Sequence, residues 1–365
     1  MGKSILCVVG ARPNFMKIAP IIQALTGVGL AAPLVHTGQH YDEAMNDRFF
    51  ADLGIPRPDV NLEVGAGSHA VQTAEIMRRF EPVLDRINPA AVLVVGDVNS
   101  TIACALVAAK KGIRVIHVEA GLRSWDRTMP EEINRVLTDQ ISDLLFTTEE
   151  DAAANLAREG IDPARVHFAG NVMIDSLKRN LERARPAADT LAAAGAGFAD
   201  GYALLTLHRP SNVDDPLVLA RLVGCIQGIA RQVPVVFPVH PRTRGRLEAA
   251  GLDRALAEAG VLLLPPAGYL EMLGLMRSAR LVLTDSGGIQ EESTALGLPC
   301  FTIRDNTERP ITVTAGTNTM VGTDPAAIEA AFADLMASGG KAGRIPDLWD
   351  GRAAERIAGV IAAWA

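Results

Sequence analysis

The chain has 365 residues, a net charge of −7 and a pI of about 5.6, and 48% of its residues are hydrophobic. A chain of this length exceeds the size at which one hydrophobic core usually keeps growing, so we expect two domains. The acidic balance disfavours broad binding to nucleic acid or to an anionic membrane, so any anion-binding site must be local.

The cysteines and the apolar stretches indicate in which cellular compartment the protein is found. No two of the four cysteines form a CxxC pair, so we expect neither a zinc site nor a disulfide framework but buried, reduced thiols. The apolar run near the N-terminus is too short for a signal peptide, and no uninterrupted apolar stretch reaches the length of about 18 residues that a membrane span needs. The sequence therefore predicts a soluble cytoplasmic protein.

Short apolar runs alternate with helical patterns through the first half of the chain. A helix is expected at about 14–25 and another, rich in Ala, at 100–112. The predicted strands of this half are 4–10, 32–38, 90–97, 114–121, 143–148 and 166–170. Strands this apolar, separated by helices, predict a parallel sheet that is covered on both faces.

A second series of strands and helices follows a segment rich in Ala and Gly at 182–201. We therefore expect an α/β fold of two doubly wound, Rossmann-like domains that face a cleft, residues 1–172 and 173–352. The amphipathic helix predicted at 353–365 is expected to pack back on the first domain. The predicted strands of the second half are 202–208, 233–240, 261–266, 280–285 and 298–303.

Polar residues follow the predicted strands of the first half, where doubly wound sheets bind ligands. Arg12 and Lys17 follow the first strand and can reach an anion, but the segment is neither a Walker A loop nor a GxGxxG fingerprint. Glu119 ends a buried strand, and a carboxylate there is costly unless it is paired or functional. Asp97 also ends a strand, although it can simply cap the next helix, and Glu131 can simply compensate a helix dipole.

The second half repeats this pattern with histidines, glycines and glutamates. His208 and His240 end two strands, and each is followed closely by arginine. The backbone amides of Ser286, Gly287 and Gly288 stand between a strand and a helix, a position that suits phosphate oxygens. A glutamate one turn into that helix lies about 5 Å further on, which suits ribose hydroxyls. A nucleoside diphosphate linked to a sugar satisfies both features.

Eight motifs, in this order along most of the chain, resemble those of the non-hydrolysing UDP-N-acetylglucosamine 2-epimerases. The resemblance implies the glycogen-phosphorylase-like GT-B fold, a homodimer, no redox cofactor and no required metal. It also implies conversion of UDP-N-acetylglucosamine into UDP-N-acetylmannosamine for cell-surface polysaccharide synthesis, by elimination of UDP to a 2-acetamidoglucal and re-addition. The motifs are GARPNFMKIAP, GDVNST, HVEAGLRS, MPEEINR, LHRPSN, VHPRTR, TDSGGIQEE and RDNTERPITVTAGT.

The resemblance also implies roles for individual residues. Proton transfer at both faces of C2 needs two separately placed acid or base groups, and the sequence does not assign the carboxylates to faces. Glu292 matches the carboxylate that binds ribose. The residues that match catalytic positions are Asp97, Glu119, Glu131 and His208. The expected substrate-binding residues are Arg12, Lys17, His240, Ser286, Gly287, Gly288, Glu292 and Arg309.

Two departures from the family pattern carry expectations of their own. Asn14 stands where many members have Glu, which can alter contacts near the sugar or the phosphate. Many bacterial members use a second UDP-sugar as an activator; Gln39 and His40 are kept here, but Asp42 and the segment 67–77 match that site weakly. We therefore expect weak activation or none.

Several other functions are compatible with the same residues. A hydrolysing epimerase would release UDP and N-acetylmannosamine, and an epimerase for a 3-acetamido or uronate derivative would use the same chemistry. A GT-B glycosyltransferase would need an acceptor site but no set of three carboxylates in the N-terminal half. A nucleotide-sugar sensor would bind UDP without turnover.

Overall fold

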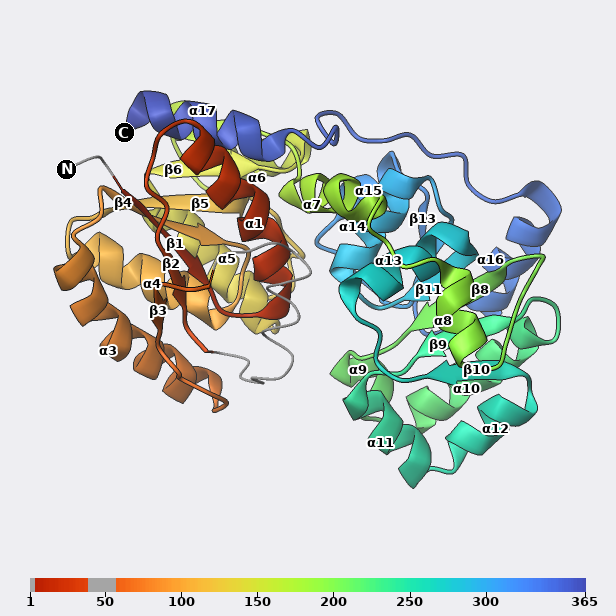
Figure 1. The fold of residues 1–365 in the computed structure, drawn as a ribbon. Coiled ribbons are helices and arrows are strands. Elements are labelled where there is room, and N and C mark those ends of the chain that lie inside the picture. The colour runs from red at the N-terminus through yellow and green to blue at the C-terminus, as the bar shows by residue number, and fades with distance from the viewer. Residues whose placement is uncertain (1–3, 39–56) are drawn as a thin grey trace. The chain divides into compact units, whose positions relative to one another are not determined.

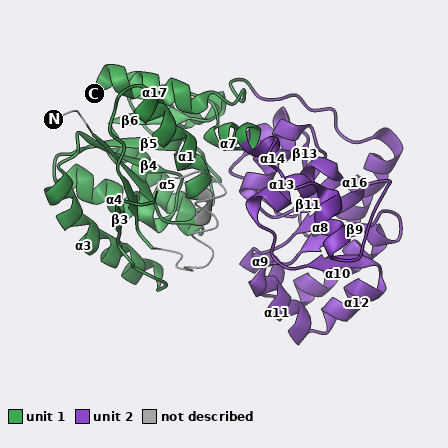
Figure 2. Cartoon of the chain, viewed as in Figure 1, with its two compact units in different colours: residues 1–179, 347–365 green, residues 180–346 purple. Residues whose placement is uncertain are grey.

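The computed structural model describes residues 4–38 and 57–365, and the chain forms two compact units (Figure 2). Unit 1 comprises residues 1–179 and 347–365, and unit 2 comprises residues 180–346. The division falls after Arg179, whereas the sequence predicted a boundary near residue 172. The residues of the expected activator site at 39–42 lie outside the described part of the chain.

Unit 1 is built on a parallel sheet of seven strands in the order β3-β2-β1-β4-β5-β6-β7 (Figure 1). Its strands are β1 (Ile5–Val9), β2 (Leu34–His36), β3 (Val60–Asn61), β4 (Ala91–Val95), β5 (Arg114–Ala120), β6 (Leu144–Thr147) and β7 (Val166–Phe168). Its helices are α1 (Arg12–Gly27), α3 (His69–Ile87), α4 (Asn99–Lys110), α5 (Pro130–Ile141), α6 (Glu150–Arg158), the 3₁₀ turn η1 (Pro163–Arg165) and α17 (Ala353–Trp364), and α7 (Val172–Leu181) leads into unit 2.

The strand order of unit 1 reverses direction between β1 and β4. The chain runs outward from β1 to β2 and β3, and then returns to place β4 on the other side of β1. Strands β1 and β4 are buried along their whole length, as expected for a parallel sheet covered on both faces. In doubly wound sheets the loops diverge at such a reversal, and a crevice opens at the carboxyl ends of the two strands.

The C-terminal helix belongs to unit 1, where α17 lies along α1 (Figure 1). The Asp175 carboxylate accepts hydrogen bonds from the amides of Ala353 (3.1 Å) and Ala354 (2.7 Å), so it caps the start of α17. The indole of Trp349, which is buried, donates to the carbonyl of Thr148 at 3.0 Å. These contacts attach the last segment of the chain to the sheet that its first segment begins.

Unit 2 repeats the design with six parallel strands in the order β10-β9-β8-β11-β12-β13. The reversal here lies between β8 and β11, so the crevice is expected at their carboxyl ends. Its strands are β8 (Tyr202–Thr206), β9 (Val235–Pro238), β10 (Val261–Leu264), β11 (Ala279–Thr284), β12 (Cys300–Thr302) and β13 (Asn318–Met320). Its helices are α8 (Ala187–Ala193), α9 (Pro210–Val213), α10 (Pro216–Ala230), α11 (Pro241–Ala249), α12 (Leu252–Glu258), α13 (Tyr269–Ser278), α14 (Gly287–Leu296), α15 (Pro310–Thr314) and α16 (Pro325–Ser338).

The fold prediction is confirmed, because both units are doubly wound parallel α/β structures. Of the strands in residues 4–38 and 57–365, the sequence analysis missed the short strands β3 and β13. Several helices open with proline in the first turn, where its missing N–H costs no hydrogen bond.

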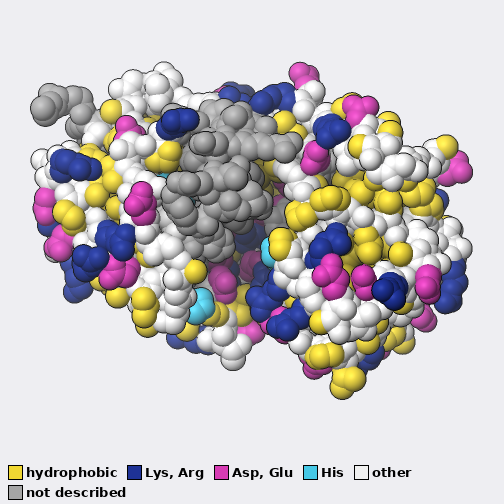
Figure 3. All heavy atoms as spheres, turned by 60° about the horizontal axis from the view of Figure 1, so that its bottom comes forward, with side chains coloured by type: hydrophobic (Ala, Val, Ile, Leu, Met, Phe, Trp, Pro, Cys, Tyr) yellow, Lys and Arg dark blue, Asp and Glu magenta, His cyan; other side chains and the backbone are white. Residues whose placement is uncertain are grey.

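Among the described residues no helix has both the length and the apolar character that a membrane span requires. On the face shown in Figure 3, basic and acidic side chains are interspersed on each unit.

Candidate active site

The crevice of unit 1 begins at Gly96, directly after β4. Gly96 has φ of +68°, and a Cβ there would lie 3.1 Å from Asn14 Nδ2 and 3.3 Å from Lys17 Nζ. Asn14 donates from Nδ2 to the carbonyl of Val95 at 2.9 Å. The absence of a side chain at residue 96 therefore lets the first turns of α1 lie against the end of β4.

Lys17 and Glu119 form a buried ion pair at this edge of the sheet. Their exposed fractions are only 6% and 2%. Glu119 has φ of +72°, and the pairing of β5 with β6 shifts register between Val118 and Ala120. A bulge of this kind re-aims a side chain, and such backbone strain concentrates at functional sites. The costly carboxylate predicted at the end of this strand is therefore paired with a lysine from α1.

Asp97 follows Gly96 and forms an ion pair with Arg135 of α5. Arg135 also donates to Glu132 Oε2 at 2.8 Å, and Glu132 accepts the amides of Ser124 and Trp125, each at 3.0 Å. Burial raises the pKa of Glu132, but these hydrogen bonds outweigh it and hold the pKa below its ordinary value. The N-cap of α4 is the next residue, so Asp97 does not cap that helix.

Helix α5 brings the third carboxylate of unit 1 to the same edge. Glu131 is half-buried in the first turn of α5. One turn later, Asn134 donates from Nδ2 to the backbone carbonyl of Asp97 at 2.8 Å, which ties α5 to the end of β4. Arg12 is the first residue of α1, and its side chain lies outside the described part of the structure.

Unit 2 places an aspartate–histidine pair at the carboxyl ends of β8 and β11. Asp285 is fully buried and accepts hydrogen bonds from the amides of His208 (2.9 Å) and Arg209 (2.8 Å). It also lies 2.8 Å from Nδ1 of His208, whose side chain is 41% exposed. Burial raises the pKa of Asp285, but its hydrogen bonds with His208 and Arg209 outweigh burial and lower it. The carboxylate thus fixes the ring, and Nε2 remains for a ligand.

A second histidine ring stands beside the first. The ring centroids of His208 and His240 are 5.8 Å apart. His240 is the N-cap of α11, and its Nδ1 accepts the amide of Arg242 at 3.3 Å. Because Nδ1 is the acceptor, Nε2 of His240 carries the ring hydrogen and can donate to a ligand oxygen.

Helix α14 begins at the carboxyl end of β11 in the manner of an anion-binding helix. Ser286 is its N-cap, and the amide of Ser286 donates to Thr284 Oγ1 at 2.9 Å, so the phosphate contact predicted for this amide has a competing acceptor. A Cβ at Gly287 would lie 2.7 Å from Glu308 Oε1, so a side chain here would have to displace the Glu308 carboxylate, which Arg304 holds at 2.8 Å. The first amides of a helix have no intrahelical acceptor, and together with the dipole they favour a phosphate.

The two glutamates of α14 have different partners. Glu291 Oε1 lies 2.6 Å from Nε of Arg309, and both side chains are buried. Glu292 accepts a hydrogen bond of 3.1 Å from the hydroxyl of Tyr269. Burial raises the pKa of Glu292 to about 7; the Tyr269 hydrogen bond opposes this rise and the charge of Glu291 adds to it. Glu291 is therefore paired with a cation, whereas the carboxylate of Glu292 is oriented by a hydroxyl group.

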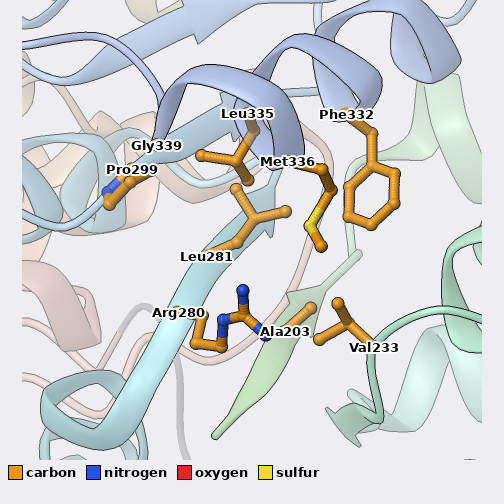
Figure 4. A pocket seen from close by; sticks show the side chains of 9 residues that line it. All are labelled: Ala203, Val233, Arg280, Leu281, Pro299, Phe332, Leu335, Met336 and Gly339. Atoms are coloured by element: carbon orange, nitrogen blue, oxygen red, sulfur yellow. The ribbon is translucent and has the colours of Figure 1, made fainter.

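A pocket of about 290 Å³ in unit 2 lies away from these polar groups (Figure 4). Ala203 and Leu281, in its wall, lie near the starts of β8 and β11, whereas His208 and Ser286 follow their ends. The pocket is therefore at the opposite edge of the sheet. Its lining comprises Ala203, Val233, Arg280, Leu281, Pro299, Phe332, Leu335, Met336 and Gly339.

The sequence analysis gave no site role to four residues that hold the predicted ones: Arg135, Glu132, Asp285 and Tyr269. The sequence did contain a signal for Asp285, since this residue ends a predicted buried strand just before the segment Ser286-Gly287-Gly288.

All four cysteines are buried and unpaired, as expected. Among the described residues, no group of three or more His, Cys, Asp or Glu side chains is arranged to hold a metal ion.

Two parallel, doubly wound units, each with polar side chains at its strand reversal, define a GT-B-like fold. The sequence model of the family described as UDP-N-acetylglucosamine 2-epimerase matches residues 25–362. The chain belongs to this UDP-N-acetylglucosamine 2-epimerase family, as its motifs suggested.

Named relatives are similar over most of their length. The UDP-N-acetylglucosamine 2-epimerase of Methanocaldococcus jannaschii is 45% identical over 322 residues, which cover 86% of this chain and 87% of that protein. The UDP-2,3-diacetamido-2,3-dideoxy-D-glucuronate 2-epimerase of Pseudomonas aeruginosa is 44% identical over 322 residues, 87% of this chain and 88% of that protein.

A solved structure agrees with the fold of this chain. The crystal structure of the M. jannaschii UDP-GlcNAc 2-epimerase in complex with UDP-GlcNAc and UDP superimposes with a TM-score of 0.90 and 41% identity. The similarity covers 99% of this chain and 100% of that chain.

Proposed function

We propose that the protein catalyses the reversible epimerisation of UDP-N-acetylglucosamine at C2, with UDP-N-acetylmannosamine as the product. The observation that carries the proposal is the buried Glu119 carboxylate, which is held in a strained bulge and paired with Lys17 at the strand reversal of unit 1. A carboxylate held in place by a cation at such a position suits proton transfer. The relative from M. jannaschii is named for this activity.

The proposed reaction has two balanced halves. A base takes the proton from C2, the electron pair of the C–H bond forms the C1–C2 double bond, and the C1–O bond breaks to release UDP. In the second half UDP oxygen bonds again to C1, and C2 receives a proton on the opposite face. Substrate and product are isomers, so the reaction needs no oxidant or reductant.

The carboxylates of unit 1 are the candidate proton carriers. Two faces of C2 require two groups in different places. Asp97 follows β4, Glu119 lies near the end of the neighbouring strand β5, and Glu131 lies on α5, which is bound to the end of β4 through Asn134. We assign proton transfer to this set of carboxylates without dividing the two faces among them.

The polar groups of unit 2 suit the UDP that leaves and returns. The amides in the first turn of α14, which have no intrahelical acceptor, and a histidine that its aspartate orients can stabilise negative charge on the departing diphosphate. Arg309 and His240 add a cation and a donor. The carboxylate of Glu292 can accept hydrogen bonds from the ribose hydroxyls, as carboxylates do in dinucleotide sites.

A second substrate is favoured by one specific comparison. The P. aeruginosa relative, which is 44% identical, is named for UDP-2,3-diacetamido-2,3-dideoxy-D-glucuronate. The C2 chemistry is the same for both sugars, so the carboxylates of unit 1 do not discriminate between them. The two sugars differ in their substituents at C3 and C6, so the contacts that the protein makes with those substituents decide which sugar is the substrate.

Proton NMR in D2O tests the proposal and separates the alternatives. The purified protein is incubated with UDP-N-acetylglucosamine, and in parallel with the diacetamido glucuronate analogue. UDP-N-acetylmannosamine with deuterium at C2 is the expected product. Free N-acetylmannosamine with UDP would indicate the hydrolysing reaction, and conversion of the analogue alone would assign the second substrate. No change in either sugar would overturn the proposal.

We also propose that the protein forms a homodimer, as the family resemblance implies. In unit 1, Ile133 and Leu137 lie one turn apart on α5 and are 47% and 50% exposed. Apolar side chains at this spacing form a stripe that a second copy can bury. Sedimentation equilibrium should give twice the chain mass for the protein and a lower mass for the variant Ile133→Glu, Leu137→Glu.

A further inference from the structure

A buried network of charged side chains lies behind the carboxylates of unit 1. It consists of Asp139 and its neighbours His117, Arg123 and Glu159, and we call it the Asp139 cluster. The side chains of Asp139, His117 and Arg123 are 0% exposed, so none of these three can meet a substrate directly. The proposed reaction does not use any of the four.

One oxygen of Asp139 is connected to the turn that carries Asp97. Asp139 Oδ1 lies 2.6 Å from Nδ1 of His117, and Nε2 of His117 lies 2.8 Å from the carbonyl oxygen of Gly96. A carbonyl only accepts, so Nε2 donates to it. Asp97 is the next residue along the chain. The ring of His117 thus links Asp139 to the backbone of Asp97.

The other oxygen of Asp139 is connected to the bulge that carries Glu119. Asp139 Oδ2 accepts the amide of Gly121 at 3.1 Å and Nη2 of Arg123 at 2.7 Å. Gly121 has φ of +78°, and a Cβ there would lie 2.5 Å from the carbonyl oxygen of Ala152. The backbone just beyond Glu119 is therefore closely confined, and Asp139 provides its hydrogen-bond acceptor.

Arg123 completes the cluster and fixes the carboxylate of Asp139. It donates from Nε and Nη2 to the two oxygens of Glu159, at 2.8 and 2.6 Å, and from Nη1 to the carbonyl of Leu122 at 2.7 Å. A bidentate pair of this kind has a defined geometry. The Asp139 carboxylate is therefore fixed by the Arg123 guanidinium. It also binds the backbone at Gly121 directly and the backbone at Gly96 through His117.

We propose that Asp139 is a positioning residue that sets the placement of Asp97 relative to Glu119. The inference rests on the proposed function, since it gives these two carboxylates their roles. A buried ionic network is poor evidence for added stability, because well-packed apolar residues often do as well. Here each oxygen of one carboxylate is connected to the backbone beside a different carboxylate of the candidate site.

Asp143 offers a matched control within the same region of the chain. Its Oδ2 accepts the amide of Val115 at 2.7 Å, near the amino end of β5. Asp143 is thus a second aspartate that accepts a backbone amide in this region, but it does so away from Glu119. Asp143 is exposed whereas Asp139 is buried, so Asp143→Asn controls for the loss of one hydrogen bond between an aspartate and the backbone.

The test compares Asp139→Asn, His117→Gln and Asp143→Asn with the unchanged protein in D2O, using UDP-N-acetylglucosamine and, if that sugar is not converted, the diacetamido glucuronate analogue. We expect kcat to fall by about 10²-fold in the first two, because small misplacement of reacting groups has effects of this size, while KM changes little. Reprotonation on the original face labels the substrate, and reprotonation on the opposite face labels the product. The ratio of deuterium in the two sugars should therefore shift in Asp139→Asn and stay constant in Asp143→Asn.

A second measurement does not depend on activity. Amide hydrogen exchange, followed by mass spectrometry, should speed up in segments 94–100 and 117–123 of Asp139→Asn but not of Asp143→Asn. If Asp139→Asn does not fold, Glu159→Gln replaces it and should show the same changes to a smaller degree. Unchanged kcat, label ratio and exchange in an active protein would overturn the inference. If the protein without any substitution is inactive, the proposed function is overturned. The hydrogen-exchange data alone would then decide whether Asp139 positions the two backbone segments.

Discussion

The hydroxyl of Tyr269 donates a hydrogen bond of 3.1 Å to the carboxylate of Glu292, five residues after the first residue of α14. The two residues come from different helices of unit 2. This contact orients the glutamate that we assign to the ribose, and it opposes the rise of the Glu292 pKa that burial causes. The affinity for UDP should therefore depend on pH near neutrality.

The first prediction concerns this pH dependence. The carboxylate form of Glu292 is the better acceptor and its pKa is about 7, so UDP affinity should be constant well above pH 7 and fall as the pH drops through 7. Tyr269→Phe removes the hydrogen bond that lowers the pKa, so the transition should move to higher pH. Isothermal titration with UDP from pH 5 to 9 measures it. Glu292→Gln serves as the control and should bind weakly at every pH; an unshifted transition in Tyr269→Phe would contradict the assignment.

The second prediction concerns the ion pair of Lys17 and Glu119. Lys17→Met leaves a buried carboxylate without its cation, which should lower the free energy of unfolding by about 3–5 kcal/mol. Adding Glu119→Gln should restore much of that stability, because the uncompensated charge is gone. Urea denaturation measures both variants.

Activity separates the two roles of this pair. Glu119→Gln, alone or with Lys17→Met, should lower kcat by orders of magnitude, since the amide cannot accept the C2 proton. A double variant that regains stability and also turns over at a normal rate would show that Glu119 is structural only.

The third prediction concerns His208 and its partner Asp285. His208→Ala should lower kcat by about 10²–10³-fold, the usual effect of removing one donor that stabilises charge developing in the transition state. Asp285→Asn should reduce turnover as well, because the ring loses the carboxylate that fixes its orientation. His167→Gln is the control, since this half-buried histidine lies on β7 of unit 1. Equal rates in all three variants would remove His208 from the site.

The fourth prediction concerns the start of α14. Gly287→Ala should weaken UDP binding, because the new methyl group would lie 2.7 Å from Glu308 Oε1 and would displace the Glu308 carboxylate beside the first turn of the helix. Gly245→Ala in α11 is the matched control, as its Cβ would meet nothing within 4 Å. Equilibrium binding of UDP measures the difference. Equal affinities would show that phosphate does not rely on this turn.

The amino-acid sequence by itself predicted both sheets and the edge at which the site lies. Strands as long as β4 and β8 can be recognised from their own residues, because the apolar pattern and the flanking turns that indicate a strand are local features of the sequence. The strands that it missed, β3 and β13, have two and three residues, too few to show a pattern. Asp97, Glu119 and His208 were selected as candidates because a polar residue at the end of a buried apolar run is unusual, whatever the chain does next.

The tertiary structure alone decided what holds those residues. Arg135 meets Asp97, Lys17 meets Glu119, and Tyr269 meets Glu292 across tens of residues or more of chain. No local pattern records such a pairing, since it depends on where two separate elements pack. The bulge at Glu119 is likewise set by the pairing of β5 with β6. Local chemistry therefore named the candidate groups, and packing between distant segments determined their partners, their orientation and their charge.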